Sequence, residues 1–278
     1  MPRTTPQPIC LTLPLLAGCG QFVLGQEPGG WGGVLVAQPP EGAVVIDART
    51  EAEWAAGHIP GAAQVHWTEL TGFDEDELWD LRPVAELEAL LGARGIPSDR
   101  PVVVYGSGPE GWGDDGNVYW VLRHLGSTGV QVLDGGYLGW LASGGDASTR
   151  LDAPDAVSFH ADPDDALLAT TAEVEGGSGA LLDVRSEEEW SDGRIPGAVW
   201  YAWDAVFQPD ATLRPAEALR AELADLGVTP DAPVVTYCAA GIRAGHTFMV
   251  LEALGFPEAS NYVGSWARWT AEGGRVEP

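Results

Sequence analysis

The chain has 278 residues, with 14 Lys+Arg against 41 Asp+Glu and a formal net charge of −27. All of its basic residues are arginines, which excludes Schiff-base chemistry and a phosphate-loop lysine. The acidic balance argues against a nucleic-acid partner, because phosphate contacts need clustered positive charge. Length and a 45% hydrophobic content predict two domains of ordinary size, and no run approaches the ~20 apolar residues of a membrane-spanning helix.

The first twenty residues differ from the rest of the chain. Arg3 is their only charge, an apolar stretch covers residues 9–16, and small residues follow, which is typical of an export signal. The junction Leu-Ala-Gly-Cys at residues 16–19 resembles the bacterial lipobox, in which cleavage precedes a cysteine that is then lipid-modified. The alternative is an ordinary secreted or unprocessed terminus.

This pattern predicts an export signal over residues 1–18, a lipid on Cys19 and a tether over residues 19–29. The folded part would then lie at the bacterial cell envelope, on its periplasmic or extracellular face, and contact the membrane only through the lipid. Cys10 would be removed with the signal, which leaves Cys238 as the free thiol of the mature chain and allows no intramolecular disulfide.

An internal repeat organises the remainder of the chain. Residues 47–62, DARTEAEWAAGHIPGA, match residues 183–198, DVRSEEEWSDGRIPGA, at a constant offset of 136. Shorter matches in the same order pair residues 95–105 with 227–237, and residues 140–145 with 269–274. Three matches in one order predict a duplicated domain.

Each half predicts the same strands in chain order. An apolar strand ends in aspartate at residues 44–47 and 181–183, and a second apolar strand covers residues 102–105 and 234–237. Short apolar runs of this kind suit a parallel sheet that helices cover. The predicted fold class is therefore α/β, with two domains that each contain a parallel sheet flanked by helices.

A helix is expected after each second strand. In the first half it begins at Asn117 and ends at Gly126, and its counterpart ends at Gly255. Residues 146–165 are rich in Asp, Ala and Pro without apolar periodicity, and we interpret them as a linker. The predicted domains are residues 30–145 and residues 166–278.

The second strand of the C-terminal half leads into the loop Cys238-Ala239-Ala240-Gly241-Ile242-Arg243-Ala244. This order puts a thiol at the carboxyl end of a parallel strand and at a helix N-terminus, where unpaired N–H groups stabilise an anion. Gly241 allows a tight backbone cradle, and Arg243 adds a fixed positive charge. We therefore interpret Cys238 as a nucleophile, with a buried structural cysteine as the alternative.

Together these motifs resemble the tandem rhodanese-like sulfurtransferases, which include thiosulfate and 3-mercaptopyruvate sulfurtransferases. The resemblance covers roughly residues 30–278 and rests on the two Gly-x-Ile-Pro-Gly-Ala segments, the Asp-x-Arg strand ends, the loop at Cys238, and the ending Asp134-Gly-Gly-Tyr…Trp140. It implies that Cys238 accepts a sulfane sulfur as a persulfide. No cofactor is expected, and no metal site either, because no Cys/His pair has ligand spacing.

The resemblance also implies that the N-terminal half is a catalytically silent copy. Gly106 is aligned with Cys238 and cannot be a nucleophile. The segment of residues 106–116 is acidic, and the interval from Tyr105 to Gly126 is three residues longer than the interval from Tyr237 to Gly255.

The substrates that the resemblance implies are a small anionic sulfur donor and a thiol or cyanide acceptor. Thiosulfate is the preferred donor and 3-mercaptopyruvate the second, but Ala240 stands where the family places lysine or serine for these donors. Relatives that act on phosphate or arsenate have five residues between Cys and Arg, against four here, which disfavours a small-anion phosphatase or arsenate reductase. A non-catalytic binding or sensing module is a further alternative, which an intact cysteine and cradle disfavour.

The loop around the thiol is predicted to bind the substrate through Ala239, Ala240, Gly241, Ile242, Arg243 and Ala244. Two residues outside the loop, Arg185 and His58, are predicted to contact the substrate as well. Arg185, aligned with the family's substrate-binding arginine, is expected to attract the donor together with Arg243, with a surface or interdomain ion pair as the alternative. His58 lies in a Gly-His-Ile-Pro turn that the resemblance would let face the interdomain cleft, with packing inside the turn as the alternative.

Overall fold

The structure is a computed structural model that describes residues 30–75, 77–151 and 154–278. The predicted export signal, the lipid site at Cys19 and the tether up to residue 29 lie outside the described residues and stay predictions. Within the described part of the chain, no helix is both long and apolar enough to cross a membrane.

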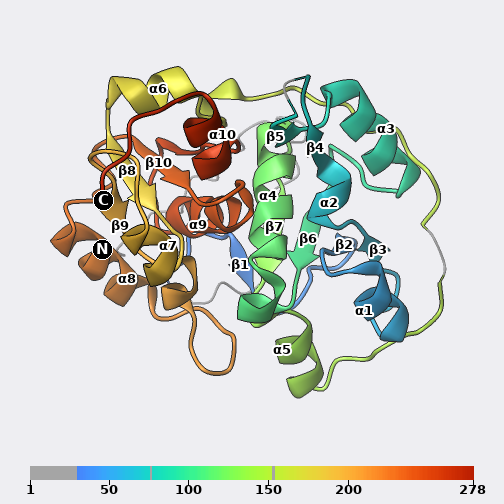
Figure 1. Ribbon diagram of the computed structural model, residues 1–278. Helices are drawn as coiled ribbons and strands as arrows, with labels where there is room; N and C mark the ends of the chain where they lie inside the picture. Colours follow the sequence, from blue (N-terminus) through green and yellow to red (C-terminus); the bar gives the residue numbers. More distant parts are fainter. Residues whose placement is uncertain (1–29, 76, 152–153) are drawn as a thin grey trace, which may run out of the picture.

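Each half is built around a parallel sheet (Figure 1). The N-terminal sheet has the order β1-β7-β6-β2-β3, and its strands are β1 (Leu35–Val36), β2 (Val44–Asp47), β3 (Ala63–Gln64), β6 (Val102–Tyr105) and β7 (Val130–Leu133). The C-terminal sheet has the order β11-β10-β8-β9, and its strands are β8 (Ala180–Asp183), β9 (Val199–Trp200), β10 (Val234–Tyr237) and β11 (Ala259–Asn261). A separate antiparallel hairpin joins β4 (Thr71–Phe73) and β5 (Trp79–Leu81).

Helices flank both sheets. Those of the N-terminal half are α1 (Glu51–Ala56), α2 (Trp67–Leu70), α3 (Val84–Ala93), the 3-10 helix η1 (Gly108–Gly111), α4 (Asp114–His124) and α5 (Gly136–Ala142). Those of the C-terminal half are η2 (Asp165–Leu167), α6 (Thr171–Gly176), α7 (Glu187–Ser191), η3 (Trp203–Val206), α8 (Ala216–Asp225), α9 (Ile242–Ala253) and α10 (Ser265–Ala271). The predicted α/β class and its duplication are confirmed.

Helix α4 begins earlier than the sequence predicted. It starts at Asp114 and not at Asn117, because Gly113 adopts a left-handed φ of +78° and caps the helix, as Gly241 does at +85° for α9. The acidic residues that follow Gly113 therefore form the first turn of α4 and do not extend the loop before it. Both helices end just before the predicted glycines, Gly126 and Gly255.

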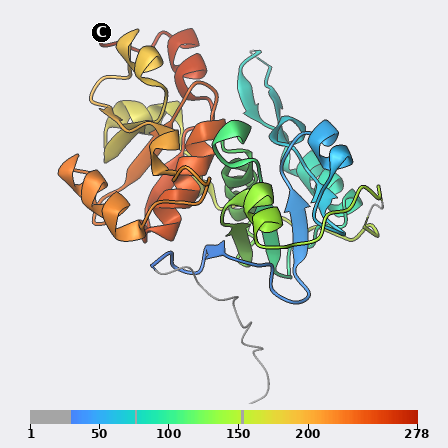
Figure 2. The ribbon, with the colours of Figure 1, turned by 90° about the horizontal axis from the view of Figure 1, so that it is seen from below.

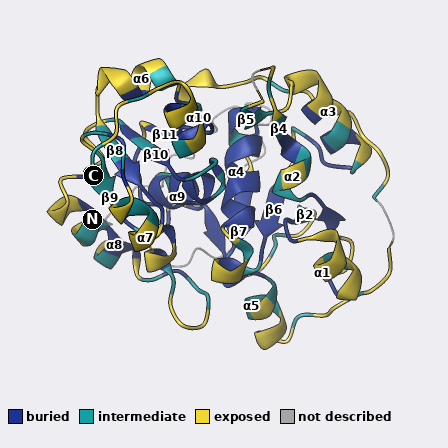
Figure 3. Ribbon diagram, in the orientation of Figure 1, coloured by how far each residue is buried: buried dark blue, intermediate teal, exposed yellow. Residues whose placement is uncertain are grey.

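The two halves join through α4 and α9, which lie side by side in the centre of the molecule (Figures 1 and 2). Glycines let these helices approach closely: a Cβ on Gly116 would lie 2.4 Å from the Cα of His246, and one on Gly245 would lie 2.8 Å from Nδ2 of Asn117. Both helices are almost entirely buried, whereas the outer helices carry the exposed residues (Figure 3). The interface between the halves is therefore part of the hydrophobic core.

The predicted linker is packed against the N-terminal half. Ser148 forms an antiparallel bridge with His58, and the N–H of Val157 donates to the carbonyl of Gly92 at 2.9 Å. Phe159 is buried, so a single apolar side chain anchors the segment without the periodicity that a sequence pattern would reveal.

His246 lies at the domain interface and not at the thiol. Its ring centroid is 5.6 Å from that of Trp203 and 5.1 Å from that of Phe207. Burial lowers the pKa of His246 to about 3, so the ring stays neutral in the folded protein while the unfolded chain takes up a proton near pH 6.5.

We expect this difference to make stability fall as the pH falls below about 6.5, by up to about 1.4 kcal/mol per pH unit from this one group. The measurement is the free energy of unfolding in urea at pH 7.5 and 5.5, for the wild type and for His246→Asn. Asn was chosen because it occupies the corresponding position of α4, where Asn117 follows Gly116 as His246 follows Gly245 in α9. Equal pH dependence in the two proteins would contradict the prediction, since all other groups are common to both.

Candidate active site

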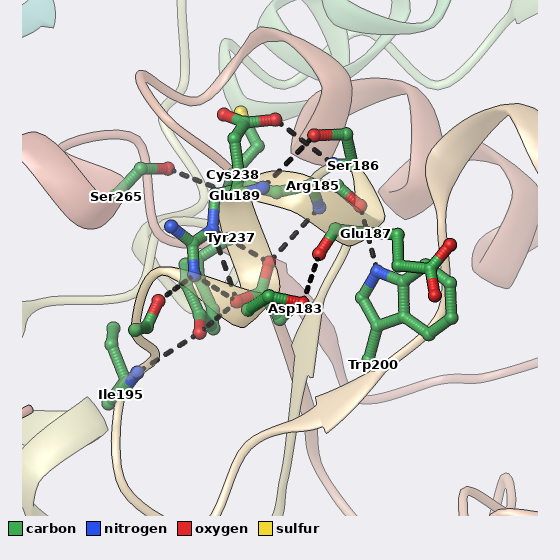
Figure 4. Close-up of polar contacts among 12 residues, drawn as sticks. Asp183, Arg185, Ser186, Glu187, Glu189, Ile195, Trp200, Tyr237, Cys238 and Ser265 are labelled. Carbon is green, nitrogen blue, oxygen red and sulfur yellow. Dashed lines mark hydrogen bonds and ion pairs between the residues drawn. The ribbon is translucent and has the colours of Figure 1, made fainter. Parts of the chain in front are cut away.

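Cys238 lies between the end of β10 and the beginning of α9, at the carboxyl edge of the C-terminal sheet (Figure 4). Its side chain is buried, at 1% exposure, and the N–H of Gly241 points at its Sγ with an N–S distance of 3.1 Å. A Cβ on Gly241 would lie 2.6 Å from the carbonyl oxygen of Val263, so only glycine fits there. The loop thus supplies a backbone donor to the sulfur.

Ser265 holds the loop from the other side. Its Oγ accepts the N–H of Cys238 at 3.1 Å and donates to the carbonyl of Tyr262 at 2.8 Å. Ser265 is fully buried with a left-handed φ of +51°, which costs a non-glycine residue about 1–2 kcal/mol. The corresponding residue of the N-terminal half is Gly136, at φ +55°. At this position a strained non-glycine residue is therefore present only in the half that carries the cysteine.

The remaining loop residues are small or apolar. Ala239 and Ala240 are partly exposed, and the N–H groups of Trp266 and Ala267 at the beginning of α10 donate to the carbonyls of Cys238 and Ala239. Ile242 is partly exposed and Ala244 is buried. Contact of these residues with a substrate stays a prediction.

The charge of Arg243 is neutralised by Glu189. Nη1 and Nη2 donate to the two carboxylate oxygens at 2.7 and 2.8 Å. Burial lowers the pKa of Arg243, but the hydrogen bonds of Glu189, followed by the charges of Cys238 and Glu189, outweigh that effect and raise the pKa overall. The same hydrogen bonds lower the pKa of Glu189 to about 2, so both groups are ionised at any working pH.

Trp112 reaches this ion pair from the N-terminal half. Its ring centroid lies 5.4 Å from the Cζ of Arg243, a cation–π distance. Trp112 is 62% exposed and has a left-handed φ of +58°. The longer loop of the N-terminal half therefore contributes an aromatic side chain to the site of the other half.

The contacts of Ser265, Glu189 and Trp112 with the cysteine loop were not predicted from the sequence. The repeat itself held a signal for the first, because a serine stands where the other half has Gly136. Glu189 is the N3 residue of a capping box with Ser186, which suggested only a helix start. Trp112 lies in an inserted stretch whose direction the sequence does not show.

Arg185 forms a buried ion pair with Asp183 (Figure 4). Its Nε and Nη2 donate to the carboxylate at 2.9 and 2.6 Å, and Nη2 also donates to the carbonyl of Gly193 at 2.7 Å. The hydroxyl of Tyr237 donates to the same carboxylate and accepts the N–H of Ile195 at 3.2 Å. This network ties the Ile-Pro-Gly turn to the ends of β8 and β10.

The N-terminal half repeats the network without a cysteine. Arg49 pairs with Asp47 and donates to Gly57, while Tyr105 bonds Asp47 and Ile59. Because the same contacts occur in the described part of the N-terminal half, which contains no cysteine, they hold the fold in both halves independently of a thiol. Donor binding by Arg185 stays a prediction, and the contacts that the structure gives it are those of an ion pair within its own domain.

His58 has contacts that match the packing alternative. Its ring stacks on Trp54 with centroids 4.7 Å apart, Nδ1 lies 2.8 Å from the Trp54 carbonyl oxygen, and its backbone pairs with Ser148. All three contacts lie within the N-terminal half and the segment packed on it. A role in substrate contact stays a prediction.

The loop that corresponds to the cysteine loop is filled by a carboxyl group. A Cβ on Gly106 would lie 2.1 Å from Oδ1 of Asp114, and one on Gly111 would lie 2.6 Å from Oδ2. Burial, with the charge of Asp115 next, raises the pKa of Asp114 well above its ordinary value.

In residues 30–75, 77–151 and 154–278, no group of three His, Cys, Asp or Glu side chains is placed to hold a metal ion.

Known proteins resemble this chain in sequence and in fold. The family model of the rhodanese-like domain matches residues 35–143 and 168–272. A thiosulfate sulfurtransferase of Azotobacter vinelandii is 33% identical over 239 residues, which cover 81% of this chain and 87% of the relative. The sulfur carrier protein TtuD of Thermus thermophilus is also 33% identical, over 77% of this chain and 82% of its own.

Among solved structures, wild-type EanB superimposes with a TM-score of 0.75 at 24% identity, over 86% of this chain and 65% of the EanB chain. YnjE superimposes with a TM-score of 0.72 at 25% identity, over 87% of this chain and 64% of its own. This chain thus spans about two thirds of the length of these neighbours. With both halves matched by the family model and relatives one third identical along most of its length, the chain belongs to the rhodanese-like sulfurtransferases and is an enzyme of the rhodanese type.

Proposed function

We propose that the protein moves a sulfane sulfur from an anionic donor to cyanide or a thiol through a persulfide on Cys238. The observation that carries this proposal is the N–H of Gly241 directed at Sγ, 3.1 Å away, at the N-terminus of α9. A backbone donor and the positive end of a twelve-residue helix stabilise negative charge on sulfur, whether thiolate or persulfide.

The reaction has two displacements. The Cys238 thiolate attacks the outer sulfur of thiosulfate, an Sγ–S bond forms, and sulfite leaves with the electron pair of the broken S–S bond. Cyanide or a thiolate then attacks the outer sulfur of the persulfide, so that Sγ leaves again as a thiolate and thiocyanate or a new persulfide is released. In both steps the Gly241 N–H faces a sulfur that gains or loses charge.

Thiosulfate is the donor that we propose first, because relatives at about one-third identity are thiosulfate sulfurtransferases. 3-Mercaptopyruvate is the second. The N-terminal half is proposed to be silent in catalysis, since Gly106 offers no nucleophile and Asp114 fills the corresponding loop.

Intact-mass spectrometry tests the proposal directly. After incubation with thiosulfate and removal of the excess, we expect the protein to gain the mass of one sulfur atom, located on the peptide that contains Cys238. Subsequent cyanide should remove that mass and yield one equivalent of thiocyanate. An unchanged mass with thiosulfate and with 3-mercaptopyruvate would favour a binding module.

A further inference from the structure

The two arginines expected to attract an anionic donor are both paired with carboxylates. Arg185 is bound to Asp183, and Arg243 is bound to Glu189 through two hydrogen bonds. The sequence contains no lysine, and its formal net charge is −27. A dianion that approaches Cys238 therefore meets neutral ion pairs near the site and a repulsive field from the whole molecule.

Glu189 is the more accessible member of the pair beside the thiol. Its side chain is 33% exposed, whereas that of Arg243 is 7% exposed. Trp112 lies over the guanidinium of Arg243 at 5.4 Å. The side that faces solvent thus presents an anionic carboxylate and an aromatic ring, beside the partly exposed and uncharged Ala239 and Ala240.

We propose that Glu189 is a specificity-determining residue. By neutralising Arg243, it lowers the rate of sulfur uptake from dianionic donors relative to the rate from an organic persulfide, R–S–SH. This inference rests on the proposed function of Cys238 and deepens it by naming a class of donor. Trp112 provides the apolar surface against which the organic group R can lie. Paired with Glu189, Arg243 attracts the dianion thiosulfate less strongly than an unpaired arginine would, whereas a persulfide with an uncharged organic group depends less on that charge.

The persulfide donor delivers the same intermediate. The Cys238 thiolate attacks the outer sulfur of R–S–SH, the new Sγ–S bond forms, and the S–S bond of the donor breaks. The leaving group is the thiolate R–S⁻, which takes a proton from water, and Cys238 carries –S–SH. No oxidant or reductant is needed, and the second displacement is identical for both donors.

The test is a ratio of two rate constants for formation of the Cys238 persulfide, followed by acid quenching and intact-mass spectrometry. The donors are thiosulfate and the persulfide of 2-mercaptoethanol, whose organic group is uncharged. We expect Glu189→Gln to raise the ratio of the thiosulfate constant to the persulfide constant by about fivefold, because one negative charge beside Arg243 is removed. The persulfide constant is the internal reference for the ratio, and urea unfolding shows that the variant is folded.

Glu53→Gln is the matched control. Glu53 stands 136 residues before Glu189 in the repeat and caps α1 through Thr50 as Glu189 caps α7 through Ser186. It accepts a hydrogen bond from Ser107 in the silent half. This substitution changes the net charge and the helix cap in the same way, so we expect its donor ratio to equal that of the wild type.

The outcomes separate the two proposals. If the wild type gains no sulfur from either donor, the proposed persulfide function is wrong. If the persulfide forms but Glu189→Gln leaves the donor ratio unchanged, or Glu53→Gln shifts it equally, the role of Glu189 is wrong and the function stands.

Discussion

Cys238→Ser is expected to abolish sulfur transfer from thiosulfate to cyanide, with a loss of roughly 10³-fold or more, while the protein stays folded. A serine hydroxyl occupies nearly the same space and can accept the Gly241 N–H that now points at Sγ. It is not nucleophilic enough to attack a sulfane sulfur at neutral pH. Thiocyanate formation measures the activity, and urea unfolding measures the fold.

The N-terminal half offers a control for this loss. Gly106→Cys in the Cys238→Ser background restores a thiol at the corresponding strand end, but its Cβ would meet Oδ1 of Asp114 at 2.1 Å. The loop there holds a carboxyl group, so we expect no recovery of activity. Substantial thiocyanate formation by Cys238→Ser alone would show that another group carries the sulfur.

Arg185→Met should lower the free energy of unfolding by about 3–5 kcal/mol, because it leaves the buried carboxylate of Asp183 without its charged partner. Arg49→Met removes the equivalent partner of Asp47 in the N-terminal half and should cost a similar amount of folding free energy. Urea unfolding of both variants at pH 7.5 gives the comparison. A loss below about 1 kcal/mol in either protein would mean that the network does not stabilise the fold as argued.

The same pair of variants tests the predicted role of Arg185 in donor binding. Measured well below the unfolding midpoint, Arg49→Met should keep the wild-type KM for thiosulfate. If Arg185 binds the donor, Arg185→Met raises that KM. If its contacts with Asp183 and Gly193 are its whole role, the two variants have the same KM.

Much of the fold could be predicted because the same structural patterns occur in both halves of the sequence. The apolar strands, the Asp-x-Arg ends and the helix-ending glycines recur at nearly constant offsets, and both sheets have the same register, with Asp47 opposite Tyr105 and Asp183 opposite Tyr237. The beginning of α4 could not be predicted, because a left-handed Gly113 caps it and Gly113 has no side chain that marks a helix start.

The candidate site was only partly predictable. Cys238 and Gly241 are adjacent in sequence to the strand and helix that position them, so local pattern was sufficient to find them. Arg243 was found as well, but its ion pair was not, since Glu189 comes from a helix 54 residues earlier. Contacts between distant segments decide whether a charge near a site is available to a ligand.

By itself the sequence determined the duplicated α/β architecture, the position of the thiol at a strand end and the lack of a cysteine in residues 30–145, because periodicity and repeats encode local structure. Tertiary structure alone decided that Arg185 lies in a buried ion pair, that Ser265 accepts the hydrogen bond from the N–H of Cys238, and that Trp112 crosses from one half to the other. The physical reason is that neutralisation of a charge and coverage of a side chain depend on the distances between segments that are far apart in the sequence, and only tertiary packing sets those distances.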